Sequence, residues 1–258
     1  MHDIMLKETV NNLASSDYIT QLKKEHSATL SGFNHEVRNY LTLINSTAQL
    51  LETKQADLKE NNYWRQICQD IEELKNLLKD FSTYNHCNNL TLVPTNLIEI
   101  IKNVKNSFEA YASFHQVEIH LDTQCHITNL PLSKTKETIS INFLEYYLCD
   151  ASKIRQALCN ILKNALEASP VGDTIEIHLE YDVKLHIISI IISNHGEKID
   201  VNTISSIFEL YYTTKKDGSG LGLPICKRIM EAHGGSIKIL SSNEQTSFFI
   251  SFPAPENM

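Results

Sequence analysis

The residues best suited to chemistry lie in one stretch near the end of the chain, residues 208–235. Within it, Gly218, Gly220 and Gly222 recur at every second position, shortly after Thr214 and Lys215. Glycines allow the backbone to adopt a positive φ and to approach a bound group, and their N–H groups can then line an anion site. The stretch therefore predicts a phosphate-binding loop. The alternative is a flexible glycine loop without a ligand.

The segment after the loop predicts a helix that begins against the same anion. Its apolar residues follow helical spacing from Leu223 onward, and Pro224 suits a first turn because its missing donor is not needed there. The N–H groups and the positive dipole end of that turn would face the anion. Gly234 and Gly235 end the helix, and residues 236–240 predict a strand. The pattern differs from the P-loop, which requires GxxxxGK[ST].

Two asparagines form a second candidate group. Residues 150–169 have one apolar face and predict a helix, on which Asn160 and Asn164 are four residues apart and lie on one side. Amide oxygens suit Mg²⁺, which prefers oxygen ligands and keeps several waters. The pair is therefore a candidate magnesium site, and two solvated amides are the alternative.

A histidine near the start of the chain is a candidate nucleophile. His35 is two residues from Phe33, about 200° around a helix, so it should project from the surface of a helical bundle. A neutral imidazole is a competent nucleophile near pH 7, and Glu36 could take the proton from its other ring nitrogen. The alternative is a solvated surface histidine. A phosphate-binding loop in the same chain favours the acceptor role.

Two long helices must position that histidine. Apolar residues recur at intervals of three and four in both, at positions 30, 33, 37, 41, 44, 48 and 51 and then 63, 67, 71, 74, 78 and 81. A polar break at about residues 52–62 separates the two segments, which predicts an antiparallel hairpin. One hairpin leaves much of each stripe uncovered, so we expect a four-helix bundle in a homodimer.

The rest of the chain predicts a sheet with one helical layer. Residues 87–95 are polar with one proline and are interpreted as a linker. The expected elements are a helix at 97–108, a strand at 117–121, one or two strands within 137–148, and a strand pair at 174–181 and 184–192. The last strand is almost wholly apolar and should be central. The order indicates an α+β protein, a helical hairpin followed by an α/β sandwich.

Composition excludes several classes of protein. The chain has 258 residues, of which 42% are hydrophobic and 21% charged, as in ordinary globular proteins. A net charge of −8 without a basic stripe argues against nucleic-acid binding. The six cysteines are scattered without a CxxC pair, which is typical of a reducing compartment. With no signal-peptide pattern and no apolar run long enough to span a membrane, we expect a cytoplasmic chain.

These segments together resemble the sensor histidine kinases of two-component systems, from about residue 30 to residue 252. The family's phosphoacceptor box, close to HE-x-[RK]-N-P-L, stands here as HEVRNYL at residues 35–41. The remaining matches are the paired-asparagine box at 160–165, the aromatic box at 208–215, the second glycine box at 218–223 and HGG at 233–235. Five motifs in the same order are a specific signal.

The resemblance implies a dimerisation and phosphoacceptor hairpin at residues 30–86, a linker at 87–95 and a GHKL-type ATP-binding domain at 96–258. It implies ATP and Mg²⁺, transfer of the γ-phosphoryl group to His35 with Glu36 as the base, and onward transfer to an aspartate of a response regulator. Asn39 would orient a water for phosphatase activity. The residues implied at the nucleotide are Asn160 and Asn164, which would also serve Mg²⁺, with Asn194, Gly196, Thr214, Lys215, Gly218, Ser219, Gly220, Leu221, Gly222 and Leu223.

The chain departs from the family pattern at two boxes. Tyr40 replaces the proline of the phosphoacceptor box, so we expect a straighter helix. Where the family usually has D-x-G-x-G, this chain has Asn194, His195, Gly196 and then Glu-Lys. The missing carboxylate would have accepted the adenine amino group. The Asn194 carbonyl can still accept it, in a neutral and weaker bond, so ATP binding is predicted.

Two other functions stay open, and so does the role of residues 1–29. The altered Asn194 box favours a phosphorelay or scaffold protein with weakened catalysis, and a GHKL ATPase that uses ATP for conformational work is a third option. Residues 1–29 carry no recognisable sensor. They are either a helical extension of the bundle or the contact for a separate sensor protein.

Overall fold

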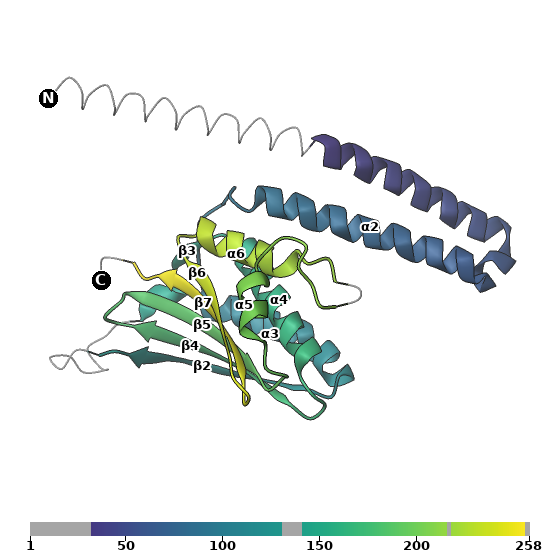
Figure 1. Cartoon of the computed structure of the whole chain (residues 1–258). Coiled ribbons are helices and arrows are strands. Elements are labelled where there is room, and N and C mark those ends of the chain that lie inside the picture. The colour runs from purple at the N-terminus through teal and green to yellow at the C-terminus, as the bar shows by residue number, and fades with distance from the viewer. Residues whose placement is uncertain (1–31, 131–140, 216–217, 256–258) are drawn as a thin grey trace, which may run out of the picture. The chain divides into compact units, whose positions relative to one another are not determined.

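The computed structural model describes residues 32–130, 141–215 and 218–255 of the chain (Figure 1). The chain divides into two compact units between Asn85 and His86. The extension expected at residues 1–29 lies outside the described residues. Within the described part, no helix combines the length and apolar character needed to cross a membrane.

The first unit is a helical hairpin, as the apolar spacing predicted. One helix covers residues 32–54, the 3-10 helix η1 follows at Ala56–Glu60, and α2 runs over Asn62–His86. The Asn61 side chain caps the start of α2, because its Oδ1 accepts the N–H groups of Tyr63 and Trp64 at 2.9 and 3.2 Å. The Trp64 indole N–H donates to Glu52 Oε1 at 3.0 Å and ties the two helices together beside the turn.

Only part of the apolar stripe is covered within one hairpin. The buried residues recur every seven positions on the first helix and include one residue of α2: Asn34, Leu41, Ala48 and Ile71. By contrast, Phe33 and Ile44 are 62% and 50% exposed, and Ile67 of α2 is 47% exposed. The hairpin therefore carries apolar surface that the same chain does not cover.

The second unit is a mixed sheet with a layer of helices. Its described α-helices are α3 (Leu97–Phe114), α4 (Ala151–Ala168), α5 (Val201–Ser206) and α6 (Gly222–Ala232). The five-stranded sheet has the order β2 (Glu118–Thr128), β4 (Thr174–Asp182), β5 (Ile187–Asn194), β7 (Thr246–Pro253) and β6 (Ser236–Ser241). Strands β2 and β4 are parallel, and the other neighbours are antiparallel. The apolar strand β5 is central, as predicted.

The core lies between the sheet and the helices. In β5, Ile188, Ile190 and Ile192 are at most 1% exposed, and alternate residues of β4 and β7 are buried in the same way. Figure 1 shows α3, α4 and α6 on one face of this sheet. The buried face of α4, with Ile154 and Leu158 among its residues, completes the core. The predicted α+β class, with helices before an α/β sandwich, is confirmed.

The structure differs from the sequence interpretation in the segment before α3. Residues 87–95 were expected to be a linker, but Cys87 is fully buried and the Thr91 N–H donates to Asp150 Oδ2 at 3.0 Å. Residues Val93–Thr95 form β1, which pairs antiparallel with β3 (Tyr147–Cys149). These contacts make the segment part of the second unit.

The strand or hairpin expected within residues 137–148 is wrong for most of the described positions. Asn142–Glu145 is the 3-10 helix η3, and β3 pairs with β1 from much earlier in the chain. Phe143 and Leu144 are 5% and 1% exposed, so burial of these side chains against the rest of the unit decides the local conformation. Residues 137–140 lie outside the described part.

Candidate functional site

The glycine loop closes onto the segment that precedes it. Gly220 has a φ of +64°, which glycine adopts without strain, and its carbonyl accepts the Tyr211 N–H at 3.1 Å. A Cβ at Gly220 would lie 2.5 Å from the carbonyl carbon of Tyr211. A Cβ at Gly218 would overlap Thr213 Oγ1. Both positions therefore require glycine, since a side chain would push the loop away from Tyr211 and Thr213.

Gly222 occupies the loop for a different reason. A Cβ there would meet Asn160 at 3.8 Å, an ordinary contact distance, and among the three loop glycines only Gly220 has a positive φ. Gly222 is the first residue of α6, and its carbonyl accepts Asn160 Nδ2 at 3.2 Å. The structure of the chain itself thus tolerates a side chain at Gly222. A need for glycine there would come from a bound group.

The start of α6 supplies backbone donors beside the loop. The Leu221 side chain is 1% exposed and anchors the loop to the core, while its N–H donates to Ser219 Oγ at 3.3 Å. Gly222 and Leu223 open the helix, where N–H groups have no carbonyl one turn earlier in the same helix. Their donors and the positive end of the helix dipole can therefore bind an anion.

The far end of α6 also follows the sequence prediction. Gly234 has a φ of +70°, its N–H donates to the Glu231 carbonyl at 3.0 Å, and the Gly235 N–H donates to the Met230 carbonyl at 2.8 Å. This is a Schellman motif, which ends a helix at a glycine. The His233 ring joins α6 to α4, because its Nε2 accepts the Asp150 N–H at 3.0 Å.

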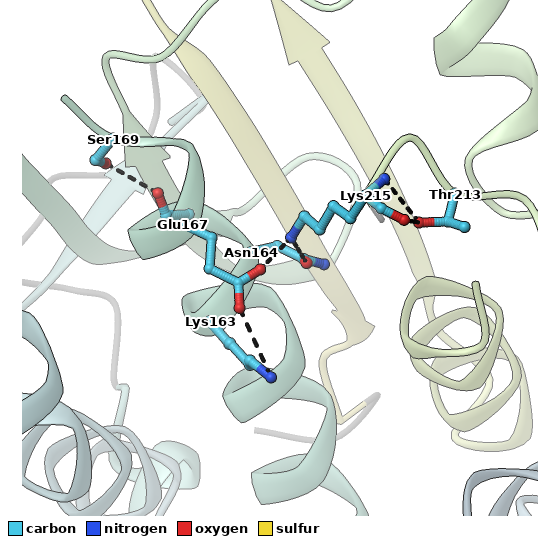
Figure 2. A network of polar contacts seen from close by, with 7 residues as sticks. Lys163, Asn164, Glu167, Ser169, Thr213 and Lys215 are labelled. Atoms are coloured by element: carbon cyan, nitrogen blue, oxygen red, sulfur yellow. Dashed lines mark hydrogen bonds and ion pairs between the residues drawn. The ribbon is translucent and has the colours of Figure 1, made fainter. Parts of the chain in front are cut away.

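Lys215, Asn164 and Glu167 meet beside the loop (Figure 2). The Lys215 ammonium donates to Asn164 Oδ1 at 2.9 Å and forms an ion pair with Glu167 Oε2. Glu167 Oε1 also lies 3.6 Å from Lys163 Nζ. Thr213 Oγ1 accepts the Lys215 N–H at 3.1 Å, which fixes the lysine backbone on the loop. Asn164 therefore presents its oxygen, rather than its NH₂ group, toward a cation.

This arrangement fits a metal-bound triphosphate. The Asn164 amide oxygen and the Glu167 carboxylate are hard oxygen donors of the kind that Mg²⁺ takes together with phosphates and water. Lys215 and the exposed Thr214 beside it lie on the glycine loop and could contact the phosphates. Among the described residues, no group of three or more His, Cys, Asp or Glu side chains could hold a metal by itself. The two oxygen donors at this site would leave the other positions around Mg²⁺ to phosphates and water.

Asn160 has a structural contact as well as its predicted role. Its NH₂ group donates to the Gly222 carbonyl, so the side chain connects α4 to the start of α6. Next to it, Cys226 is fully buried and donates to the Ala157 carbonyl at 3.5 Å. Burial raises the pKa of Cys226 to about 12, so this thiol stays protonated and behaves as a small apolar residue.

A second group lies where β5 ends. Asn194 is 1% exposed, and its Nδ2 has no hydrogen-bond partner among the described residues. Gly196 follows two residues later, where a Cβ would lie 2.6 Å from the Ala168 carbonyl oxygen and 2.9 Å from Asn194 Nδ2. The end of α4, the Asn194 amide and the loop backbone therefore approach one another closely, and only glycine fits at position 196.

Asp173 holds the loop after Asn194 in place. Its carboxylate accepts the His195 N–H at 3.0 Å, His195 Nδ1 at 2.8 Å and the Thr174 N–H at 2.7 Å. Burial acts to raise the pKa of Asp173, but these bonds and one from Ser169 outweigh it and lower that pKa below its ordinary value. The His195 side chain is 53% exposed in the loop and is also bonded to this buried carboxylate.

His35, Glu36 and Asn39 lie on the first helix of the hairpin. His35 and Glu36 are exposed, as predicted for His35. Asn39, one turn later, places its Nδ2 3.2 Å from His35 Nδ1. In that orientation the Asn39 NH₂ group donates a hydrogen bond to His35 Nδ1, so a neutral His35 ring carries its proton on Nε2. Turning the amide over would place Oδ1 there, hold the proton on Nδ1 and leave Nε2 as the nucleophile.

Glu167 and Asp173 were missed by sequence reasoning. Glu167 had a usable signal, since it follows Asn164 by three residues and must share its side of α4. Asp173 had none, because its main partner is 22 residues away in sequence and the contact depends on how β4 pairs with β5.

Comparison with known proteins finds a family model that matches most of the second unit. Residues 149–256 match the family described as Histidine kinase-, DNA gyrase B-, and HSP90-like ATPase. Sporulation kinase C of Bacillus subtilis is 30% identical over 223 residues, which cover 85% of this chain and 46% of that kinase. The chain thus spans less than half of the length of that relative.

Two solved structures share the fold. Full-length ShkA in complex with AMPPNP superimposes with a TM-score of 0.67 at 20% identity, covering 87% of this chain and 45% of ShkA. Histidine kinase ThkA in complex with the response regulator protein TrrA gives a TM-score of 0.58 at 20% identity, covering 90% of this chain and 64% of that chain.

Proposed function

This chain belongs to the sensor histidine kinases of two-component systems, and from that premise we propose that it is an ATP-dependent kinase that phosphorylates its own His35. The observation that carries the proposal is the closed glycine loop beside Lys215, Asn164 and Glu167. Such a site works by positioning the phosphates and neutralising their charge, with little covalent chemistry of its own.

Each residue then has a defined task. Lys215 and the first N–H groups of α6 would hold the phosphates, Asn164 and Glu167 would hold Mg²⁺, and Asn194 would contact the base. When bound, Mg²⁺ would neutralise negative charge on the phosphates. At His35, the unprotonated ring nitrogen bonds to the γ-phosphorus as the bond to the β,γ-bridging oxygen breaks, and Glu36 accepts the proton from the other nitrogen.

The partners follow from the same family. We propose a response-regulator receiver domain, whose aspartate takes the phosphoryl group from His35, and a second copy of this chain at the uncovered apolar surface of the hairpin. The ThkA structure that shares the fold contains a response regulator, which supports the first partner. The exposure of Phe33, Ile44 and Ile67 supports the second.

Labelling with ATP tests the kinase proposal. The full chain incubated with Mg²⁺ and γ-labelled ATP should take up label that is stable in alkali and lost in acid, and His35→Gln should take up none. A chain that binds ATP but stays unlabelled at every ATP concentration would refute it. His35→Arg serves as a second variant, since it keeps a long polar side chain at this exposed position without an imidazole ring.

The second candidate is a scaffold with weakened catalysis, and Asn194 favours it. A neutral amide binds the adenine amino group less strongly than a carboxylate does. This candidate predicts a folded dimer that binds the regulator without incorporating label. The third candidate, a GHKL ATPase, predicts ATP hydrolysis that continues unchanged in His35→Gln.

Phosphatase activity is the finer part of the proposal. The Asn39 amide lies against the His35 ring, so it could orient a water for attack on the phosphorylated aspartate. Asn39→Ala should slow release of phosphate from the regulator by about tenfold or more while His35 is still labelled. Equal loss of both activities would show instead that Asn39 acts on the imidazole alone.

A further inference from the structure

Asn194 is the last inward-facing residue of β5. Every second residue before it, Ile188, Ile190 and Ile192, lies in the apolar core, and Asn194 continues that row at 1% exposure. Its NH₂ group nevertheless has no partner among the described residues. A buried donor without an acceptor destabilises a fold unless a ligand uses it, so this amide marks a place where a polar group is to be bound.

The surroundings leave the orientation of this amide undetermined. Thr246 of β7 is opposite Asn194 in register and is 4% exposed, but its hydroxyl lies 2.7 Å from Ser241 Oγ. The buried carboxylate of Asp173 is occupied by His195 and Thr174. Because none of these groups bonds to Nδ2, the Asn194 amide can turn over to suit a ligand.

An amide and a carboxylate differ in which purines they accept. A carboxylate only accepts hydrogen bonds, so it pairs with the 6-amino group of adenine and repels the 6-oxo group of guanine. An amide carries one acceptor and one donor. It can accept from the amino group and donate to N1 of adenine, or turn over to donate to the oxo group and accept from N1–H of a 6-oxopurine.

We propose that Asn194 makes the base pocket permissive, so that this chain binds 6-oxopurine nucleotides as well as ATP. The inference rests on the proposed function, because it takes the site at Asn194 to be the base pocket. The repulsive element that would exclude guanine and hypoxanthine is absent from this position. The geometry thus assigns to Asn194 the purine selectivity of the site.

Binding to the full chain with Mg²⁺ tests the proposal. Dissociation constants for ATP, GTP and ITP would be measured by calorimetry, with CTP as the control for a base that is not a purine. ITP is the decisive probe, because it has the 6-oxo and N1–H groups of GTP without the 2-amino group. ITP should bind within about tenfold of ATP, and binding more than about a hundredfold weaker would overturn the proposal.

Asn194→Asp provides the matched variant, since it restores an acceptor-only side chain of the same size. It should raise the preference for ATP over ITP by roughly tenfold to a hundredfold, and an unchanged preference would contradict the role given to the amide. If the variant fails to fold, as its melting curve would show, the comparison of ITP with ATP in the unaltered chain still decides. If the chain binds ATP but not ITP, this inference is refuted and the proposed function is not. If the chain binds none of the nucleotides, the proposed function is refuted as well.

Discussion

Single residues in the glycine loop have separate physical reasons for their identity. Gly220 has a positive φ, a side chain at Gly218 would collide with Thr213, and Gly222 has room for a side chain. The sequence alone shows three glycines at alternate positions and does not distinguish their roles. The structure separates the two that build the loop from the one that lies open at the start of α6.

Alanine substitutions should therefore have graded effects. Gly220→Ala strains the backbone and collides with Tyr211, so it should lower the free energy of unfolding by about 1–3 kcal/mol and abolish measurable ATP binding. Gly222→Ala should leave the melting temperature nearly unchanged and weaken ATP binding only if the nucleotide approaches that backbone. Thermal melting and calorimetry check both. Equal destabilisation by the two substitutions would contradict the assignment.

Asp173 predicts a dependence of stability on pH. Because its pKa is lowered in the folded chain, its contribution is complete above the unfolded pKa of about 4 and is lost as pH falls through the folded value. Asp173→Asn should lower the free energy of unfolding by about 1–3 kcal/mol near pH 7. Below about pH 4 the stability of the variant should fall less steeply than that of the unaltered chain. Melting curves between pH 7 and pH 3 measure this. If the stability of Asp173→Asn changed with pH in the same way as that of the unaltered chain, Asp173 would not be a source of the loss of stability in acid.

At the residue scale, the sequence predicted the exposure of His35 and the placement of Asn160 and Asn164 on one side of a helix, while the roles of these residues stay predictions. His35 is exposed as predicted, and Asn164 presents its oxygen to a cation. Glu167 could have been placed on the Asn164 side of α4, but its contact with Lys215 and the contact of Asp173 with His195 join elements that are adjacent only after the sheet and helices have assembled.

At the scale of elements, an ion pair joins α4 to the glycine loop, in addition to the hydrogen bonds that Asn160 and Asn164 make with it. Glu167 of α4 holds Lys215, which would otherwise be available to a triphosphate. An exposed pair of this kind contributes little to stability, but it competes directly with an anionic ligand for the same ammonium group.

In the absence of Mg²⁺, Glu167→Gln should therefore tighten ATP binding by about two- to fivefold, because it releases Lys215 and removes a negative charge beside the phosphates. Glu109→Gln is the control, since its carboxylate pairs with Lys105 at 2.8 Å on α3 and carries the same charge. Calorimetry with and without Mg²⁺ gives the result. With Mg²⁺ present the same substitution should weaken ATP binding, because a metal ligand is lost, and tighter binding in both titrations would contradict the role of Glu167 at the metal.

Elements with a strong apolar period were predictable, and short ones were not. The hairpin helices, α4, α6 and the β4–β5 pair follow their periods, and β5 is central because it is almost wholly apolar. The strands β1 and β3 are three residues each and pair over a long separation in sequence. No local pattern indicated β1, and the strands expected within residues 137–148 overlap β3 only at their last two positions. Because β1 pairs with β3, residues 87–95 belong to the second unit and do not form the expected linker.

At the scale of the whole molecule, the hairpin predicts self-association. Apolar residues on both helices are exposed in one chain, and a second copy could bury them. Ile44→Lys with Ile67→Lys should convert the dimer to a monomer, because each dimer would then bury four charges.

Light scattering after size exclusion measures the mass. Leu185→Lys is the matched control, since Leu185 is 63% exposed in the turn between β4 and β5 and should leave the dimer intact. A monomeric unaltered chain, or a dimer that survives both lysines, would contradict the predicted bundle.

The central claim is that the glycine-loop site transfers a phosphoryl group to His35, and locating that group on the chain tests it most directly. Mass spectrometry of peptides prepared at alkaline pH after incubation with Mg²⁺ and ATP should find phosphohistidine at residue 35, and Gly220→Ala should show none. Phosphate on a serine, a threonine or another histidine, with residue 35 unmodified, would contradict the account.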